Sequence, residues 1–360
     1  MAATTVNAPF FTTNILVNTL ATRKVVFLPS ASRSGPGKLY FIKDICGNCA
    51  ASTIFISTVG SDTFDNKTRG STAYAIMSTN FQSVLLMSDG LSNWYILQNY
   101  ISNAVFSPSF FTPTSLTGSG LQLWLDATDT STQTVSVNLD VSVWRDKSGI
   151  GNNTTATGTA GLIKQNANAI NGRTALLFLN SYFTGGFVTA NTGATAHAFC
   201  VATQNSSSGS AGRVLSLTRP GVADFNQTNT SMMFGRNGAQ NLRIMRNNIN
   251  TTVDLPGYAT PFLAQSSQNG ATQIIGLNGT LSPLTGNNGT AVNLNITQFG
   301  IGGTPADVNY WGGFIGEVIY YNTVLSTTNR QKVEGYLAWK WGIQSNLPYE
   351  HPFKYVPPRN

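Results

Sequence analysis

Charged residues are scarce in this chain of 360 residues. Lys, Arg, Asp and Glu together make up 10% of it, against roughly 25% in ordinary soluble domains. Disordered chains are usually highly charged and poor in aromatic residues, whereas aromatic residues here reach 11%. The composition therefore predicts an ordered, loop-rich, all-β protein whose surface is neutral and rich in hydroxyl and amide groups.

Clusters of basic residues are missing as well, although the formal net charge is +7. Neighbouring Lys and Arg residues come as pairs at most: Arg23 and Lys24, Arg145 and Lys147, Arg243 and Arg246. A nucleic-acid-binding protein presents a basic face, so we expect no nucleic-acid partner. A mildly basic surface suits an acidic protein or a glycan instead.

Long apolar runs are also missing, and none approaches the roughly 20 residues that a membrane helix needs. The first residues, Met1 to Thr5, have neither the basic region nor the apolar region of a signal peptide. We therefore expect synthesis in a cytosol or its equivalent and no membrane insertion.

Cysteine is rare, and its odd number, three, argues against a complete disulfide framework. Cys46 and Cys49 have the spacing of a redox motif or of half a zinc site. A zinc site needs two more ligands, and Cys200 is the only other cysteine. We interpret the motif as a turn that carries two thiols.

Candidate acids and bases are few. Glycoside hydrolysis needs two carboxyl groups about 5–9 Å apart, and two residues at alternate positions of one strand would point to the same face. The glutamates are Glu317, Glu334 and Glu350, and none has a carboxylate two residues away. The histidines, His197 and His351, accompany no Gly-x-Ser-x-Gly nucleophile elbow. We therefore expect structural or solvated histidines, no catalytic residues and no enzyme.

Short runs with strand-like alternation dominate what is present. After an N-terminal arm, residues 1–22, which is either mobile or donated to a neighbouring chain, residues 23–105 form a small β-domain. Its expected strands are 25–28, 38–43, 53–57, 73–77, 84–87 and 93–97. The last two strands flank Ser88-Asp89-Gly90-Leu91-Ser92, which suits a hairpin loop.

The turns of this domain carry a resemblance. The pattern runs from Gly37-x-x-Tyr40-x-Ile42-Lys43-Asp44 through Gly60-x-Asp62-x-x-Asp65 to Ser88-Asp89-Gly90 and Trp94. Over about sixty residues it resembles the small β-modules of phage tail-fibre proteins and of the surface and capsid proteins of large DNA viruses. The resemblance implies a module that anchors the chain in a particle.

Residues 106–120 hold Pro108, Pro113 and a Gly-Ser-Gly run, so we predict a linker there. A second domain follows at 121–345, with a Pro-rich tail at 346–360. Its strands recur at the spacing of a β-sandwich. They are expected at 121–125, 141–144, 174–178, 198–202, 213–217, 231–234, 242–245, 274–277 and 311–322.

The last of these strands and a helix after it organise the domain. Both strand faces are apolar, with Phe314, Val318 and Tyr320 on one and Ile315, Ile319 and Tyr321 on the other, so we expect the strand between two layers. The helix should begin at Ser326 or Thr327 and end at Gly342. Its apolar stripe consists of Val333, Tyr336, Leu337 and Trp341.

Five spaced motifs of this domain resemble the concanavalin A-like lectin/glucanase superfamily of the laminin-G/pentraxin type. They are Leu123-Trp124-Leu125-Asp126-Ala127, Trp144 to Gly149, Asn171-Gly172-Arg173, Gly316 to Asn322, and Glu334 to Gly342. The resemblance covers about 230 residues. It implies a jelly-roll sandwich of two antiparallel sheets with one short C-terminal helix.

Related domains often bind Ca²⁺, which takes oxygen ligands from loops. The candidates are Asp126, Asp129 and Asp146, although Asp also favours turns for its own sake. No other cofactor is expected. Glycans would stack on aromatic residues at strand ends, and the candidates are Tyr182, Phe183, Tyr258, Tyr310 and Trp311.

Two functions remain open. The first is a non-enzymatic structural protein of a virus particle, a minor capsid, vertex (penton) or fibre component, assembled in the host cytoplasm. Its partners would be other capsid proteins and copies of itself, since particle proteins form symmetric oligomers, and an outward lectin-like domain would bind host glycans. The alternative is a carbohydrate-binding, lectin-like module of a cellular or extracellular protein, which predicts a secretory signal.

Overall fold

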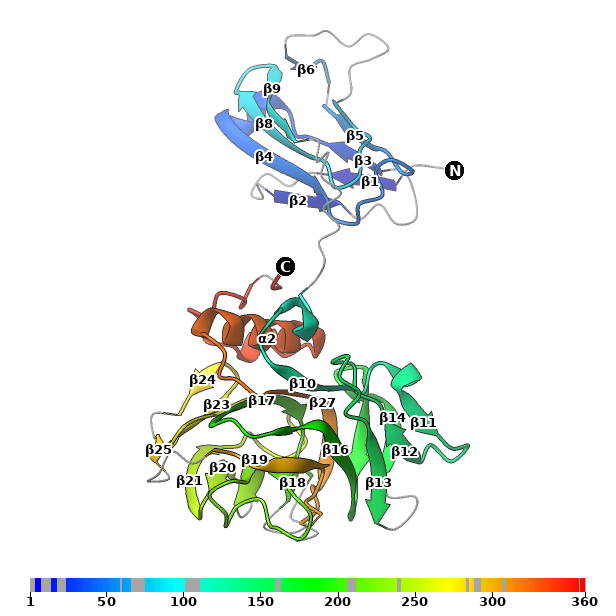
Figure 1. Cartoon of the computed structure of the whole chain (residues 1–360). Coiled ribbons are helices and arrows are strands. Elements are labelled where there is room, and N and C mark those ends of the chain that lie inside the picture. The colour runs from blue at the N-terminus through cyan, green and yellow to red at the C-terminus, as the bar shows by residue number, and fades with distance from the viewer. Residues whose placement is uncertain are drawn as a thin grey trace. The chain divides into compact units, whose positions relative to one another are not determined.

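The computed structural model of the chain describes residues 4–7, 14–17, 24–58, 60–65, 75–100, 111–158, 163–205, 212–237, 241–282, 285–287, 293–305, 309–355 and 357–359. The chain divides into two compact units, Met1–Ser109 and Phe110–Asn360. Both consist mainly of strands (Figure 1), so the all-β prediction is confirmed. No helix in these ranges is long and apolar enough to span a membrane.

The first unit contains two small sheets. One sheet has the order β1 (Thr4–Asn7), β3 (Lys24–Phe27), β5 (Ile54–Ser57) and β7 (Ala75–Met77). The other has the order β2 (Asn14–Val17), β4 (Pro36–Asp44), β8 (Ser83–Asp89), β9 (Asn93–Tyr100) and β6 (Thr63–Phe64). A short helix, α1 (Ala31–Ser34), follows β3. Buried residues of both sheets form one core, with Tyr40 packed edge-on to Trp94.

The six strands predicted in this unit are present. The N-terminal arm is described only in part, at β1 and β2. These two segments pair in parallel with β3 and β4 of the same chain. Phe10 and Phe11, the two aromatic residues of the predicted arm, lie outside the described residues.

The second unit is longer at both ends than the predicted domain. Phe111 is buried, and Pro113–Ser115 form a 3₁₀ turn, so the described part of the predicted linker belongs to this unit. The predicted tail also packs against the unit, because Leu347 and His351 are buried. The backbone N–H of Phe111 donates a hydrogen bond to the carbonyl of Pro358, which joins the two ends of the unit.

Two sheets make up the second unit, and every pairing between their described strands is antiparallel. The helix-side sheet has the order β14 (Ile163–Ile170), β15 (Arg173–Phe178), β27 (Gly313–Tyr321), β17 (Thr195–Ala202), β22 (Phe262–Asn269), β23 (Thr272–Leu277) and β24 (Thr280–Leu281), with β10 (Leu121–Asp126) on β27 and β25 (Gly286–Asn287) on β23. The opposite sheet has the order β11 (Gln133–Val135), β12 (Val141–Trp144), β13 (Thr154–Gly158), β16 (Ser181–Asn191), β26 (Ile296–Ile301), β18 (Arg213–Thr218), β19 (Ser231–Asn237), β20 (Asn241–Arg246) and β21 (Ile249–Asp254).

The inner faces of the two sheets enclose the main core, which includes Trp144, Phe183 and Trp311. A second core lies on the other face of the helix-side sheet, beneath α2 (Thr327–Lys340). Figure 1 shows α2 across this sheet, close to the C-terminal end of the chain. Strand β27 therefore lies between two layers, as predicted.

The division of side chains between the two faces of β27 differs from the prediction. Along β17, Val201 pairs with Glu317 and Ala202 pairs with Ile315, which leaves Gly316 as an extra residue in a bulge. One extra residue reverses the alternation of side chains. As a result, Ile315 joins the main core and Phe314 packs on the helix side.

Helix α2 matches the prediction at both ends. The Ser326 side chain caps its start by accepting a hydrogen bond from the Asn329 N–H at 3.3 Å. At the other end Gly342 has a φ of +67°, which suits glycine. Val333, Leu337 and Trp341 of the predicted stripe are buried, and Tyr336 is partly buried beside them.

Candidate ligand-binding site

A buried carboxylate lies under α2. Glu317 on β27 is fully buried. Its carboxylate accepts hydrogen bonds from Trp124 Nε1 at 2.7 Å, Trp341 Nε1 at 2.8 Å and the Tyr336 hydroxyl at 2.8 Å. Lys340 Nζ forms an ion pair with it at 2.7 Å. These contacts fix the helix on the sheet, and burial beside Glu317 raises the pKa of Tyr336 far above its usual range.

A second carboxylate lies directly across the strand pair. Asp126 on β10 is in register with Glu317, and Lys340 Nζ also lies 2.6 Å from Asp126. Lys147 Nζ then bridges Asp126 at 2.8 Å and Asp129 at 2.9 Å. Burial alone would raise the pKa of Asp126, but Lys340, Lys147 and the Thr128 hydroxyl outweigh it and lower that pKa.

The Ca²⁺ site predicted at Asp126, Asp129 and Asp146 is not borne out by this geometry. Lysine ammonium groups already occupy the space beside Asp126 and Asp129. The Asp146 carboxylate accepts backbone hydrogen bonds from Trp124 and Asn152 and so closes a loop. Within the described ranges, no group of three His, Cys, Asp or Glu residues could hold a metal ion.

No carboxylate lies two residues from Glu317 along its own strand, but Asp126 faces it from another strand. Sequence spacing could not show this pair, since its members are far apart in the chain. Both carboxylates nevertheless make ion pairs with lysine and are buried, Asp126 with 3% of its surface exposed. The pair therefore stabilises the attachment of α2.

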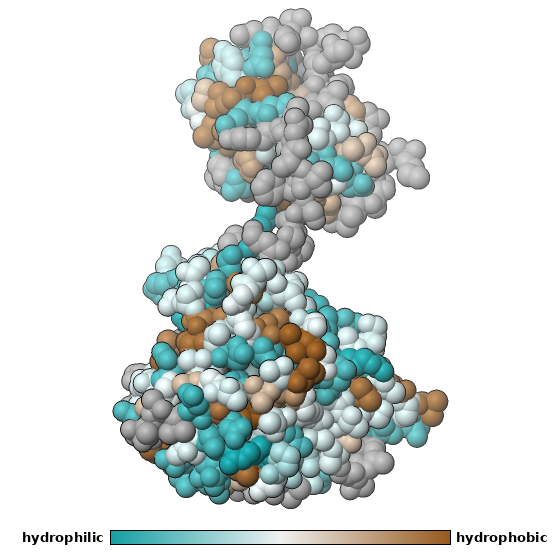
Figure 2. Space-filling view, in the orientation of Figure 1, coloured by the Kyte–Doolittle hydropathy of each residue, from teal (hydrophilic) through white to brown (hydrophobic). Residues whose placement is uncertain are grey.

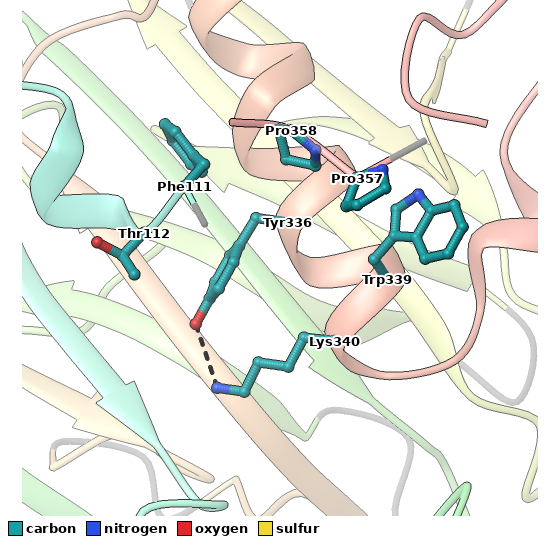
Figure 3. Close-up of a pocket in the computed structure, with 7 residues that line it drawn as sticks. All are labelled: Phe111, Thr112, Tyr336, Trp339, Lys340, Pro357 and Pro358. Carbon is teal, nitrogen blue, oxygen red and sulfur yellow. Dashed lines mark hydrogen bonds between the residues drawn. The ribbon is translucent and has the colours of Figure 1, made fainter. Parts of the chain in front are cut away.

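An apolar pocket of about 320 Å³ opens on the outer side of α2. Figure 3 shows Tyr336 in its middle, with Phe111 and Thr112 on one side and Trp339, Pro357 and Pro358 on the other. Lys340 also lines the pocket, and its Nζ lies 3.2 Å from the Tyr336 hydroxyl. Three aromatic side chains and two proline rings thus surround a space in the size range of small-ligand sites.

The C-terminal segment forms one wall of this pocket and is held firmly. Trp339 Nε1 donates a hydrogen bond to the Phe353 carbonyl at 2.7 Å, and His351 Nε2 lies 3.2 Å from Glu334. The same segment exposes Tyr349 and Tyr355, with 76% and 65% of their surfaces accessible and their ring centroids 6.2 Å apart. Figure 2 shows hydrophobic residues gathered on the surface of the second unit near α2, among more polar ones.

The five aromatic residues predicted to bind glycans do not form one site. Phe183 and Trp311 are fully buried in the main core, so they cannot present a ring to a sugar and that part of the prediction is wrong. Tyr182 is also largely buried and packs against Tyr310, with ring centroids 6.1 Å apart. Tyr258 is 40% exposed.

Sequence reasoning missed the pocket residues. Phe111 was assigned to a linker, and Pro357 and Pro358 to a tail. Trp339 offered a usable signal, because it is an aromatic residue placed off the apolar stripe of an amphipathic helix. A side chain off this stripe is not directed at the core, so it is a candidate for binding a ligand at the surface.

The remaining chemical groups are structural. Cys46 and Cys49 are free thiols in the predicted turn, and Asp44 accepts hydrogen bonds from the backbone N–H groups of both. Burial, together with the charge of Asp44, raises the pKa of Cys49 to about 12, so its thiolate is scarce at neutral pH. His197 is buried, with its Nε2 2.8 Å from Gln265 Oε1.

Comparison with protein-family models finds no match, and comparison with curated protein sequences finds none. Among solved structures, the chain is similar to Trypanosoma rangeli sialidase in complex with sialic acid, with a TM-score of 0.44 and 14% identity over 61% of this chain and 33% of that one. It is also similar to domain 4 of the extracellular GH43 arabinanase AbnA from Geobacillus stearothermophilus in complex with arabinotriose, with a TM-score of 0.40, 14% identity and coverage of 58% and 95%. A third similar structure is the binding domain of botulinum neurotoxin serotype D, with a TM-score of 0.39, 9% identity and coverage of 60% and 50%. The chain thus spans about a third of the sialidase chain and half of the toxin domain.

Proposed function

We propose that this chain is a non-enzymatic structural protein of a virus particle whose second unit binds glycans. The observation that carries the binding function is the pocket beside α2, which three aromatic side chains line. The apolar face of a sugar ring stacks on such side chains, while the Thr112 hydroxyl at the pocket wall can hydrogen-bond to a sugar hydroxyl. Tyr349 and Tyr355 offer further ring surface along the same C-terminal segment.

The pocket suits a neutral sugar. Its one cationic lining residue, Lys340, already makes ion pairs with Asp126 and Glu317, so it has little charge left to attract an anion. The buried acids are committed to the same contacts, which supports binding rather than hydrolysis. Under this proposal a bound glycan is recognised and not cleaved.

A glycan array tests this function directly. Wild-type protein should retain neutral glycans, with no release of reducing sugar, and Trp339→Ala should weaken that binding by at least tenfold because it removes one wall of the pocket. Leu179→Ala is a suitable control, since Leu179 is 42% exposed and does not line the pocket. Equal binding by wild type and Trp339→Ala, or cleavage of the bound glycan, would contradict the proposal.

The particle role rests on two observations. The sequence of the first unit resembles fibre and capsid modules, and the chain has few residues that could act as catalytic acids or bases. Other capsid proteins and copies of this chain would be its partners. Particles purified from producing cells should contain the chain in a fixed ratio to the other shell proteins. Antibodies against the second unit should label intact particles, and recovery of the chain only outside particles would refute this role.

A further inference from the structure

We propose that the side chains of Lys340 and Asp126 become joined by an amide bond, which the folded protein forms by itself with Glu317 as the group that moves the protons. The bond ties α2 covalently to β10. It concerns the attachment of the helix and does not depend on glycan binding at the pocket.

The two groups that react are held against each other inside the second unit. Lys340 Nζ lies 2.6 Å from Asp126 Oδ1, which places the amine beside the carboxyl carbon that it attacks. The Asp126 side chain is 4% exposed and the Lys340 side chain 16%. An amine and an acid fixed in this way react far more readily than the same groups free in solution, because no entropy is lost in bringing them together.

A second buried acid lies beside the same amine. Glu317 Oε2 is 2.7 Å from Lys340 Nζ, and the Glu317 side chain is fully buried. A site that is poor in water favours transfer of the ammonium proton to a carboxylate, since this turns a buried ion pair into a neutral pair. The neutral amine is the nucleophilic form of lysine. Although burial acts in the opposite direction, Lys340 and Lys147 lower the pKa of Asp126, so Glu317 is the acid that takes the proton.

The reaction balances without any further reactant. Glu317 takes one proton from the Lys340 ammonium, and the electron pair left on Nζ forms a bond to the carboxyl carbon of Asp126. Lys147 Nζ, 2.8 Å from Asp126 Oδ2, stabilises the negative charge on that oxygen. Oδ1 then leaves as water with two protons that came from the nitrogen, one of them through Glu317. The amide keeps the third proton, and Glu317 ends as the carboxylate that it was.

Lys147 also contacts Asp126, but its surroundings do not favour the same reaction. The second acid beside it is Asp129, whose side chain is 34% exposed, and the Lys147 side chain is itself 22% exposed. Water at such a site keeps both charges hydrated and preserves the ion pair. Of the two lysines, Lys340 is the one whose two acids are both buried, so the bond forms there.

Intact-mass spectrometry of the denatured full chain tests this bond. Wild type should be lighter than its sequence requires by the mass of one water molecule. Lys340→Arg, which keeps the charge but cannot form this amide, should have its full mass. A protease digest of wild type should contain one branched peptide that joins residues 126 and 340. Lys164 is the internal control, because its pair with Asp140, at 2.5 Å, is more exposed, and it should be recovered unlinked.

A second variant tests the role of Glu317. Glu317→Gln keeps the size of the side chain but cannot take the proton, so the branched peptide should accumulate roughly a hundredfold more slowly after expression, with tryptophan fluorescence as the check on folding. An equal rate in folded Glu317→Gln would overturn the proton-transfer step. The bond itself is refuted if folded wild type has its full mass, if the branch starts at Lys147 or ends at Glu317, or if the lost water is traced to ring closure at Asp89-Gly90.

Discussion

The ionisable side chains of this protein differ chiefly in whether they have partners. Glu317 and Asp126 are tightly paired with lysine, whereas Arg236 is buried with unsatisfied nitrogens. Residue type alone does not reveal this difference, because it depends on contacts between strands that are distant in sequence. Sequence analysis could name Glu317 as an isolated acid, but it could not show Asp126 opposite it.

His197 gives a prediction about pH at this scale. Burial lowers its pKa to about 4, outweighing the Gln265 hydrogen bond, which acts in the opposite direction. In the unfolded chain the pKa of histidine is about 6.5. Above that pH neither state binds the proton, and below it only the unfolded chain does. The free energy of unfolding should therefore fall by roughly 3 kcal/mol between pH 6.5 and pH 4 through this residue.

Urea denaturation of wild type and His197→Gln at several pH values measures this contribution. The variant has no titrating group at the position, so its stability should decline less steeply over the same pH range. The two proteins are compared by the slope of unfolding free energy against pH and not by its absolute value. The substitution itself alters packing against Phe199, whose ring centroid lies 4.6 Å from that of His197. Parallel slopes for the two proteins would show that His197 does not remain neutral in the folded state.

Among the elements, β27 and α2 were largely predictable because local signals specify them. The cap at Ser326, the terminal glycine at 342 and the apolar stripe all lie within one short segment. The bulge at Gly316 was not predictable, since it depends on how β17 and β10 pair with the strand. Strand β22 was missed for a related reason, because Gln265, Ser266 and Gln268 are polar yet buried.

Gly316 offers a test of how the strand and the helix fit together. A Cβ atom at this position would lie 2.5 Å from the Trp341 ring, so Gly316→Ala should push α2 away from the sheet. Overpacking of this kind costs roughly 1–3 kcal/mol, and urea denaturation measures it. Gly186→Ala is the matched control, because its nearest contact would be 3.8 Å away. Equal stability of the two variants would mean that the helix yields without cost.

At the scale of the whole molecule, each unit has a core of its own. The first unit buries residues of both its small sheets together, and the second buries a main core and a layer under α2. The sequence analysis placed the boundary in the Pro- and Gly-containing stretch 106–120, and the two compact units of the structure meet in sequence between Ser109 and Phe110. It set the start of the second unit too late, because the role of Phe111 depends on contacts with Tyr336 and Pro358, more than 200 residues later.

This organisation predicts that residues 110–360 fold and bind glycans without the first unit. The fragment contains the whole pocket beside α2, together with the hydrogen bond that joins its own ends. Its affinity for neutral glycans should lie within about twofold of that of the full chain, whereas a fragment that starts at 121 should unfold more readily because it loses Phe111 from the helix-side core. Thermal melting and glycan titration of both fragments measure these effects. Equal melting temperatures for the two fragments would show that residues 110–120 are a linker after all, and loss of binding by the longer one would place part of the glycan site in the first unit.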